Sequence, residues 1–260
     1  MGQHSGQYCE SFITIVTDNS KNNDLWTALS DASGKEITKI MEIWTKEVGY
    51  PVISVTESED GIHVQQNRFL QTGYATSEED KTIYPVLLTL STGKGAHENI
   101  LFNQRRMSIA LQDLGFFKLN INHSGIYRTL YTPERLLRLG EAMKLNLLDV
   151  EDRIGLISDA AALATSGYQK TSALLGLLAN LKGESNSIVW EEIISRLAAV
   201  QCAWLFQPRE TQSALKHFIR DLVSPKARAL GWKFNAKDEI LLQQHRSTMF
   251  RAAGLAGDEV

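Results

Sequence analysis

The sequence predicts a multi-domain α+β protein: a short helical segment, then a small β-sandwich, then an α-solenoid-like helical array. The spacing of apolar residues predicts this order in three steps. They first recur at helical spacing, then alternate in short runs between turn sequences, and finally return to helical spacing. A chain of 260 residues is long enough to bury a substantial core.

Residues 23–50 carry the helical spacing that predicts two short helices. The first is expected to end at Gly34, because glycine tolerates the left-handed backbone that follows many helices. The second is expected to end near Gly49, and Pro51 prevents its continuation because proline lacks the amide hydrogen that a helix needs. Residues 1–22 are an N-terminal segment that we assign to no domain.

Residues 51–131 change to the alternation that predicts strands, and we assign them to the β-sandwich. Turn sequences separate the strands at Ser58–Gly61, Ser91–Gly95 and Asn122–Gly125. Several short strands at this spacing are typical of a sandwich of about 80 residues. The expected strands lie at 52–54, 62–64, 84–90, 107–111 and 116–131.

Residues 132–260 return to helical spacing, and short connections suggest stacked antiparallel helices. Thr132 and Pro133 are expected to start the first helix, as its cap and its first residue. Trp190 and Trp204 fit a buried helical stripe. The last residues offer no closing cap, so we expect the array to be incomplete. Later helices are expected from Asp149, from Thr171 or Ser172, from Ser187, and over 209–223 and 237–253.

Composition excludes several functional classes. A formal net charge of −3 gives no basic face for nucleic acid. No apolar run approaches the roughly 20 residues that cross a bilayer, and no secretory signal is visible at the N-terminus. Cys9 and Cys202 are far apart in sequence, which fits a reducing compartment without disulfides or a cysteine metal site. We therefore expect a cytoplasmic protein that binds neither nucleic acid nor membranes.

A set of short motifs gives the chain a family resemblance. In order, they are Asp24–Trp26, Trp44–Pro51, Gln66–Phe69, Lys118–Asn120, Gly125–Arg128 and Asp152–Asp159. With these motifs, the chain resembles the C-terminal half of gluzincin zinc aminopeptidases of the alanyl, puromycin-sensitive and endoplasmic-reticulum types. The runs Tyr131–Leu136 and Ala164–Ser172 are most similar to fungal alanine/arginine aminopeptidases. Tyr84-Pro85 departs from the Trp-x-Ile-Pro strand of the family.

The resemblance implies a role for each part of the chain. Residues 23–50 would be a helical remnant of a catalytic domain, 51–131 the β-sandwich, and 132–260 a C-terminal domain like that of endoplasmic-reticulum aminopeptidases. The complete enzymes remove N-terminal residues from peptides. They hold zinc with a His-Glu-x-x-His helix and a later glutamate, because histidines at i and i+4 reach the same ion. Their C-terminal half closes over the catalytic domain and shapes the chamber that admits peptides.

The catalytic motifs of that family are missing from this chain. None of the six histidines has a second histidine at i+4. His97 and Glu98 form the one His-Glu pair, but Leu101 stands where the second ligand belongs. The Gly-x-Met-Glu-Asn loop that holds the substrate amine is absent, and the catalytic tyrosine matches no residue here. We therefore assign no catalytic, cofactor-binding or metal-binding residue, and expect zinc only in the full-length family.

Other residue patterns are interpreted as structural. Ser91–Gly95 has the wrong order for a phosphate-binding loop and fits a hairpin turn better. Ser124 beside His123 suggests a nucleophile and base, but no orienting acid is evident. Arg105 and Arg106 are expected on a solvated strand face rather than at a docking site.

Charged residues of the expected helix that follows Asp149 are also interpreted as structural. Arg153 can pair with Asp149 four residues earlier. Asp152, Arg153 and Asp159 are expected to link neighbouring helices. In the sandwich, an ion-paired arginine beside a core aromatic residue is expected at Arg68 and Phe69, and Tyr127 and Arg128 have the same status.

The leading hypothesis is the non-catalytic C-terminal part of a zinc aminopeptidase, inactive alone. A truncated gene product, a degenerate paralogue and an isolated fragment remain alternatives for its origin. A second hypothesis is a free-standing helical module that binds peptides or a full-length paralogue on a concave surface. A third is a new hydrolase built on His97 or His123. Whether the chain is itself an enzyme stays open. Trp26 and Trp44 are expected to expose an apolar patch that promotes self-association.

Overall fold

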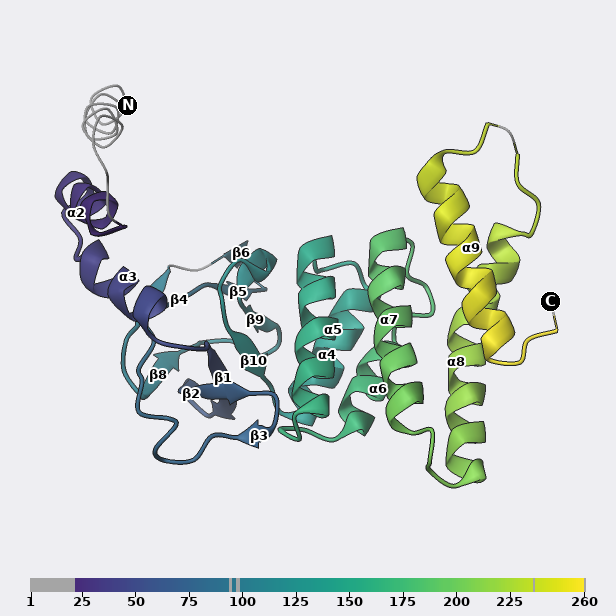
Figure 1. The fold of residues 1–260 in the computed structure, drawn as a ribbon, viewed down its shortest axis with the longest axis horizontal. Helices are drawn as coiled ribbons and strands as arrows, with labels where there is room; N and C mark the ends of the chain where they lie inside the picture. The colour runs from purple at the N-terminus through teal and green to yellow at the C-terminus, as the bar shows by residue number, and fades with distance from the viewer. Residues whose placement is uncertain (1–21, 94, 97–98, 236, 260) are drawn as a thin grey trace.

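The computed structural model describes residues 22–93, 95–96, 99–235 and 237–259. The segment before residue 22, which the sequence assigned to no domain, lies outside these residues. Two helices come first, a group of short strands follows, and a row of helices extends from the strands to the C-terminus (Figure 1). This order confirms the α+β class.

Helices α2 (Asn22–Ser33) and α3 (Ile37–Lys46) have no fully buried residue. Trp44 connects α3 to the strands: its ring centroid lies 5.3 Å from that of Tyr84, and its indole N–H donates to the Pro85 carbonyl oxygen at 3.1 Å. Both Trp44 and Trp26 are half-buried. The expected exposed patch is therefore wrong for Trp44, because the strands cover this ring.

Within the described part of the chain, the strands form one five-stranded sheet and two smaller sheets. In the largest sheet, β1 pairs antiparallel with β2 and parallel with β10. Its members are β1 (Pro51–Ser58), β2 (Gly61–Leu70), β3 (Gly73–Tyr74), β8 (Arg106–Ala110) and β10 (Arg128–Leu130). The two smaller sheets contain β4 (Val86–Leu88) with β7 (Ile100–Phe102), and β5 (Leu90–Thr92) with β6 (Gly95–Ala96) and β9 (Phe117–Leu119).

Turn chemistry explains where these strands begin and end. Gly61 closes the β1–β2 hairpin with φ +148°, and a Cβ there would lie 2.1 Å from the Ile109 carbonyl oxygen. The run expected at 116–131 divides into β9 and β10 at the turn sequence expected at Asn122–Gly125, and a 3₁₀ turn, η1 (Ile121–His123), lies at the start of this connection. Asn120 and Asn122 cause the break, because both adopt left-handed backbone angles that asparagine tolerates better than most residues.

The remaining helices start close to the residues that the sequence predicts. Thr132 caps α4, accepting a hydrogen bond from the Arg135 N–H, and Pro133 is its first residue. Lys170, rather than Thr171 or Ser172, is the N-cap of α6. The bounds are α4 (Pro133–Lys144), α5 (Val150–Thr165), α6 (Thr171–Ala179), α7 (Ser187–Ala203), α8 (Arg209–Leu230) and α9 (Ile240–Leu255).

Helix α8 extends seven residues beyond its expected end at residue 223 and contains Pro225. A proline inside a helix removes one backbone hydrogen bond. Here Leu222, Val223 and Ala227 are almost completely buried on either side of it. Burial of this apolar face keeps the chain helical in spite of the local cost.

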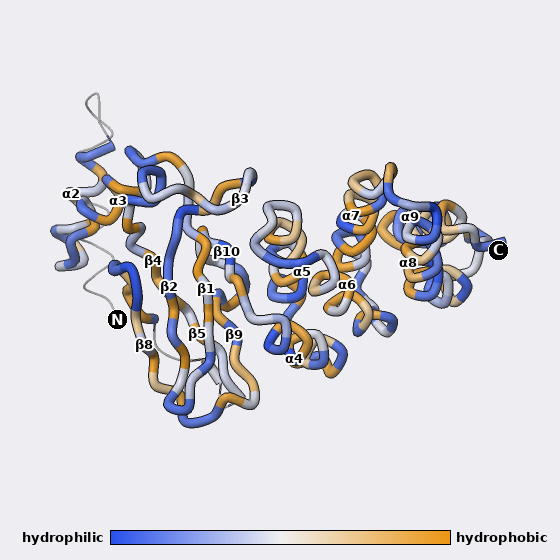
Figure 2. The backbone as a smooth tube through the Cα atoms, turned by 90° about the horizontal axis from the view of Figure 1, so that it is seen from below, coloured by the Kyte–Doolittle hydropathy of each residue, from blue (hydrophilic) through white to orange (hydrophobic). Residues whose placement is uncertain are grey.

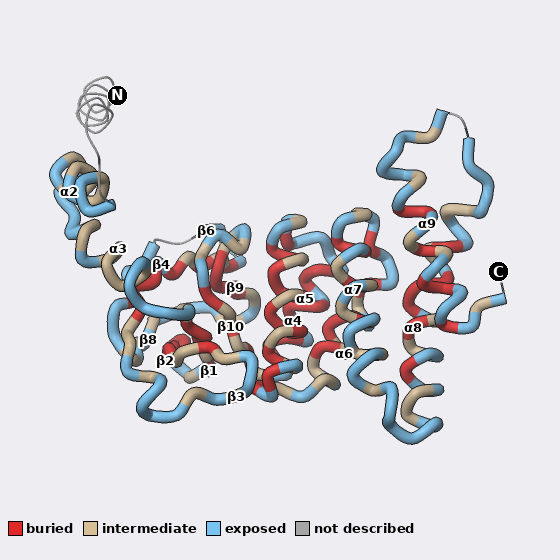
Figure 3. Tube along the Cα trace, viewed as in Figure 1, coloured by how far each residue is buried: buried red, intermediate tan, exposed pale blue. Residues whose placement is uncertain are grey.

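One apolar cluster runs without interruption from the strands into the helices. It joins Ile53 of β1 and Phe102 of β7 to Trp190 of α7 and Met249 of α9. Buried stretches run through the strands and through the helices of the row, and apolar stretches occur along the same elements (Figures 2 and 3). The regular superhelical stacking expected for 132–260 stays a prediction. No helix in the described ranges has the length and apolarity that a bilayer crossing requires.

Candidate functional site

A buried ion pair fixes the N-terminal half of α5 against β9. Lys118 Nζ lies 2.7 Å from Asp152 Oδ1, and the two side chains are only 2% and 6% exposed. The ammonium also donates to the carbonyl oxygens of Leu119 and Asn120. Burial lowers the pKa of Lys118, while the Asp152 carboxylate opposes that shift. Asp152 was expected to link α5 to a neighbouring helix. The structure shows that it links α5 to a strand instead.

A second carboxylate fixes the C-terminal half of α5 against β10. Asp159 accepts hydrogen bonds from the Thr129 N–H at 2.9 Å and from Arg128 Nη1 at 3.0 Å. Burial raises the pKa of Asp159, and His123, the Thr129 N–H and Arg128 each oppose the rise. His123 Nε2 is 3.8 Å from the carboxylate. Asp159 thereby holds Arg128 at the surface between sheet and helices, and it too pairs with a strand rather than a helix.

Arg153 makes the link between helical elements that the sequence suggested, but with a different partner. Its Nη1 lies 2.6 Å from Glu184 Oε2, where the expectation was Asp149. The Trp190 indole N–H donates to the Glu184 carbonyl oxygen at 2.9 Å. Arg153 thus connects α5 to the segment that precedes α7, and the buried Trp190 confirms its expected place in the core.

Arg128 also lines a cavity of about 570 Å³ beside α5 and α7, which we call the α5–α7 cavity. Small residues of α5 and α7, including Ala162 and Ala199, leave the space between the two helices open. Tyr50 and Trp204 supply aromatic rings, and Arg128 and Arg196 supply guanidinium groups. The volume lies within the range of known ligand sites, roughly 300–1,000 Å³. Such a cavity suits an apolar group beside a carboxylate or a peptide carbonyl.

Two residues of this cavity escaped the sequence-based interpretation. Trp204 was expected in a buried stripe, but it is half-buried at the C-cap of α7 and lines the cavity. Arg196 belongs to none of the motifs found in the sequence. Its Nε donates to Glu192 Oε1 at 2.8 Å, and its side chain is 36% exposed. The available signal was the small residues in both helices, which indicate close approach or a hollow between them.

The arginines near β2 and β8 differ in part from their expected roles. Arg105 was expected on a solvated strand face, but it is half-buried. Its Nη1 lies 2.9 Å from Asp80 Oδ1 and also donates to the Gln66 carbonyl oxygen, which holds the loop after β3 against β2. Arg106 is exposed as expected. Arg68 makes no ion pair among the described residues and donates to a backbone oxygen at 3.4 Å. Phe69 packs in a small core cluster, as expected.

The described residues do not fit a zinc ion. No group of three or more His, Cys, Asp or Glu side chains suited to a metal occurs among them. Ser124 donates to the Ile121 carbonyl oxygen rather than to His123, so the two do not form a nucleophile and base. His97 and Glu98 lie outside the described residues. The segment around Ser91–Gly95 forms the expected hairpin, since β5 pairs with β6.

Comparison with known proteins identifies the family. Residues 116–260 match the family model described as the ERAP1-like C-terminal domain. The chain is 45% identical over 241 residues to Aminopeptidase 2, mitochondrial, and 44% identical over 241 residues to Alanine/arginine aminopeptidase, both of Saccharomyces cerevisiae. It is 31% identical over 261 residues to Aminopeptidase M1-A of Oryza sativa subsp. japonica.

These alignments cover 92%, 93% and 97% of this chain but only 25%, 28% and 29% of the relatives. The chain therefore spans little more than a quarter of the length of the curated relatives it matches. The resemblance to fungal aminopeptidases that the short motifs suggested is confirmed. The chain belongs to the family of ERAP1-like C-terminal domains and corresponds to the C-terminal portion of aminopeptidases.

Proposed function

We propose that this chain is the non-catalytic C-terminal part of a zinc aminopeptidase, and that its α5–α7 cavity contacts the peptide being processed. The observation that carries the proposal is a ligand-sized cavity with two guanidinium groups, in a chain whose described residues offer no zinc site. In the complete enzyme, zinc would activate water and polarise the scissile carbonyl. This chain would instead bind and orient the peptide away from the reacting bond.

The lining residues match the chemistry of a peptide. Arginine binds carboxylates and carbonyl oxygens through several N–H groups in a fixed plane. Arg196 engages Glu192 four residues earlier on the same helix, and a peptide carboxylate can compete for it at modest cost, because ion pairs of this spacing contribute little. Trp204 and Tyr50 add ring surfaces for apolar side chains. The cavity therefore favours a peptide with both apolar and acidic groups.

A second candidate is a free-standing module that binds peptides or a full-length paralogue. The α5–α7 cavity favours it, because a cavity of this size can hold part of a peptide. On either proposal we place the protein in the cytoplasm, with neither nucleic acid nor membrane as partner. Self-association is proposed through the former domain interface, the faces of residues 24–48 and of the strands that a catalytic domain would cover, where Val48 is 77% exposed.

Zinc analysis and an aminoacyl-fluorogenic assay on the purified chain test the loss of catalysis. We expect zinc well below one ion per chain and no turnover. Stoichiometric zinc with bestatin-sensitive turnover would refute the non-catalytic assignment. Adding the separately expressed catalytic portion of a yeast relative distinguishes the two candidates, because restored turnover supports the enzyme part and its absence supports the free-standing module.

Peptide binding is tested with Trp204→Ala, and Trp232→Ala serves as the matched control. Trp232 is 68% exposed and lies outside the α5–α7 cavity. We expect Trp204→Ala to weaken binding of short fluorescent peptides by about tenfold, the effect of losing one well-packed aromatic contact. The control should leave binding unchanged. Equal loss in both variants would contradict a role for the cavity.

A further inference from the structure

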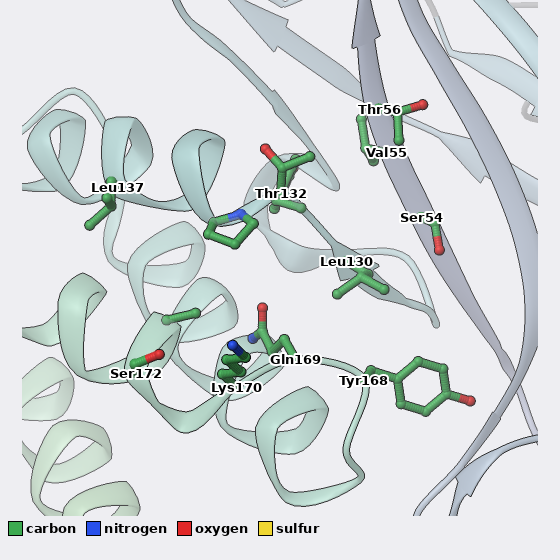
Figure 4. A pocket seen from close by; sticks show the side chains of 13 residues that line it. Ser54, Val55, Thr56, Leu130, Thr132, Leu137, Tyr168, Gln169, Lys170 and Ser172 are labelled. Carbon is green, nitrogen blue, oxygen red and sulfur yellow. The ribbon is translucent and has the colours of Figure 1, made fainter.

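A second cavity of about 640 Å³ lies between β1, β10 and the first turns of α4 and α6 (Figure 4). It exists because β10 ends at Leu130 while β1 continues to Ser58, so the chain leaves the sheet at Thr132 to start α4. None of its lining residues lines the α5–α7 cavity. The two cavities are therefore separate sites, and we call this one the β1–α4 cavity.

The walls of the β1–α4 cavity are mainly apolar. Val55, Leu130, Pro133 and Ala173 contribute from four different elements or their connections. Leu137 lies at the same cavity and is 47% exposed, which leaves apolar surface of a leucine open to water. Burying that surface under a ligand is favourable, and each added methylene of the ligand strengthens binding about fourfold.

A polar cavity of about 660 Å³ adjoins it on the outer face of the large sheet. Ser54 and Thr56 of β1 line both cavities, so the two are neighbours at that strand. On the polar side, His63 Nδ1 lies 2.8 Å from Ser108 Oγ, and the Arg106 guanidinium donates to a glutamine side chain of β2. One end of this elongated site is therefore apolar and the other is rich in hydrogen-bond donors.

The charges that line the site are all of one sign. Among the residues that the structure describes, no aspartate or glutamate lines either cavity, and the charged lining residues are Lys170 and Arg106. Lys170 is exposed at the N-cap of α6 and has no ion pair within the described ranges. The carboxylate of β1, Glu57, is held by Arg135 at 2.8 Å and does not neutralise the site. Charge complementarity therefore selects an anion.

From this arrangement we propose that the site binds a medium-chain organic carboxylate. The acyl chain lies in the β1–α4 cavity, and the carboxylate lies among the hydroxyl and cationic groups at its mouth. Nothing in this proposal depends on the peptide-binding role of the α5–α7 cavity. The ligand class follows from an apolar volume of suitable size joined to a donor-rich, positively charged opening.

Competition on the intact 260-residue chain tests the ligand class. The probe is anilinonaphthalene sulfonate, an apolar fluorophore with an anionic group, displaced by octanoate, octanol or octylammonium. We expect octanoate to displace the probe about fivefold better than octanol, the upper range for one exposed charge pair. Decanoate should exceed octanoate. Equal displacement by octanol, or better displacement by an acetylated dileucine carboxylate, would overturn the assignment.

Variants locate the site. Ala173→Phe fills the cavity and should weaken octanoate binding by about tenfold or more, the equivalent of losing two buried methylenes. Leu137→Gln and Lys170→Ala should also weaken binding. The matched controls are Leu145→Gln, at a leucine 67% exposed outside both cavities, and Lys182→Ala. Neither control should change binding.

Thermal unfolding verifies that each variant is folded before its affinity is interpreted. If Ala173→Phe does not fold, Leu137→Gln and Lys170→Ala decide the outcome, because both replace partly or fully exposed side chains. Loss of binding in these two but not in the controls supports the site. Unchanged binding in both, or equal loss in the controls, overturns it.

Discussion

The pair between Lys118 and Asp152 allows a sharp test of how sheet and helices are joined. Their side chains are 2% and 6% exposed, and the Nζ–Oδ1 distance is 2.7 Å. Replacing Asp152 with Ala leaves a buried ammonium without its counter-charge, which typically costs about 3–5 kcal/mol. Since a domain is commonly stable by only about 5–15 kcal/mol, this variant should lose a large share of its stability.

The matched comparison is a double variant, Lys118→Met with Asp152→Leu. It removes both charges and fills their space with apolar atoms, so its unfolding free energy should return to within about 1 kcal/mol of wild type or exceed it. Lys118→Met alone should lose about as much unfolding free energy as Asp152→Ala, because it leaves the buried carboxylate without its counter-charge. Urea denaturation followed by circular dichroism gives the four free energies and the coupling between the two sites.

Burial of Lys118 also gives the Asp152→Ala variant a distinct pH dependence. The pKa of Lys118 is already lowered in the fold, and loss of the carboxylate lowers it further. Below the folded pKa the ammonium is protonated in both states and its burial is unfavourable. Above that pKa the unfolded chain binds more protons than the folded one, so stability should rise with pH. An Asp152→Ala variant that loses under 1 kcal/mol, or a double variant no better than either single one, would refute this account.

Three further outcomes follow from other contacts. Hydrogen bonding from Arg135 lowers the pKa of Glu57, so its stabilisation is present above the unfolded value of 4.5 and disappears as pH falls through the folded pKa. As the pH falls, the free energy of unfolding measured in urea should therefore decrease more for wild type than for Glu57→Gln. In Gly155→Ala, the new Cβ would lie 2.3 Å from His123 Nδ1, costing about 1–3 kcal/mol. Adding His123→Gly should restore the melting temperature, since residue 123 has φ +50°. Trp190→Phe leaves the Glu184 carbonyl oxygen without its hydrogen-bond donor and should lower the free energy of unfolding in urea by about 1–3 kcal/mol. A loss under about 0.5 kcal/mol would argue against this hydrogen bond.

Local chemistry explains which parts of the fold could be predicted. The start of α4 depends on Thr132 and Pro133 alone, and the hairpin at Gly61 depends on residues within a few positions. The turn sequence at Asn122–Gly125 predicted a break in the last strand-like run, but apolar alternation did not show that the break begins at Asn120, whose backbone is left-handed. The position of α5 was predictable, whereas the partners of its charges were not.

Which side chains become partners depends on how the helices pack, and the sequence alone did not predict this packing. Arg153 was expected to contact Asp149 one turn earlier, but Glu184, 31 residues later, offers a buried position with several hydrogen bonds. The α5–α7 cavity is a stronger case. Arg196 and Trp204 become neighbours of Arg128 only when α7 packs beside α5, and neither belongs to a motif. Residue spacing therefore could not predict this cavity, although it predicted most of the helices that form it.

The continuous core described above has a mechanical consequence. Ile53 of the sheet and Trp190 of α7 belong to one apolar cluster, and the ion pairs of α5 cross the same boundary. Sliding the strands against the helices would therefore open apolar surface to water and separate buried charges. The contrast is α2, which has no buried residue. We therefore expect any large displacement within this chain at α2, while the sheet and the helical row move together as one rigid body.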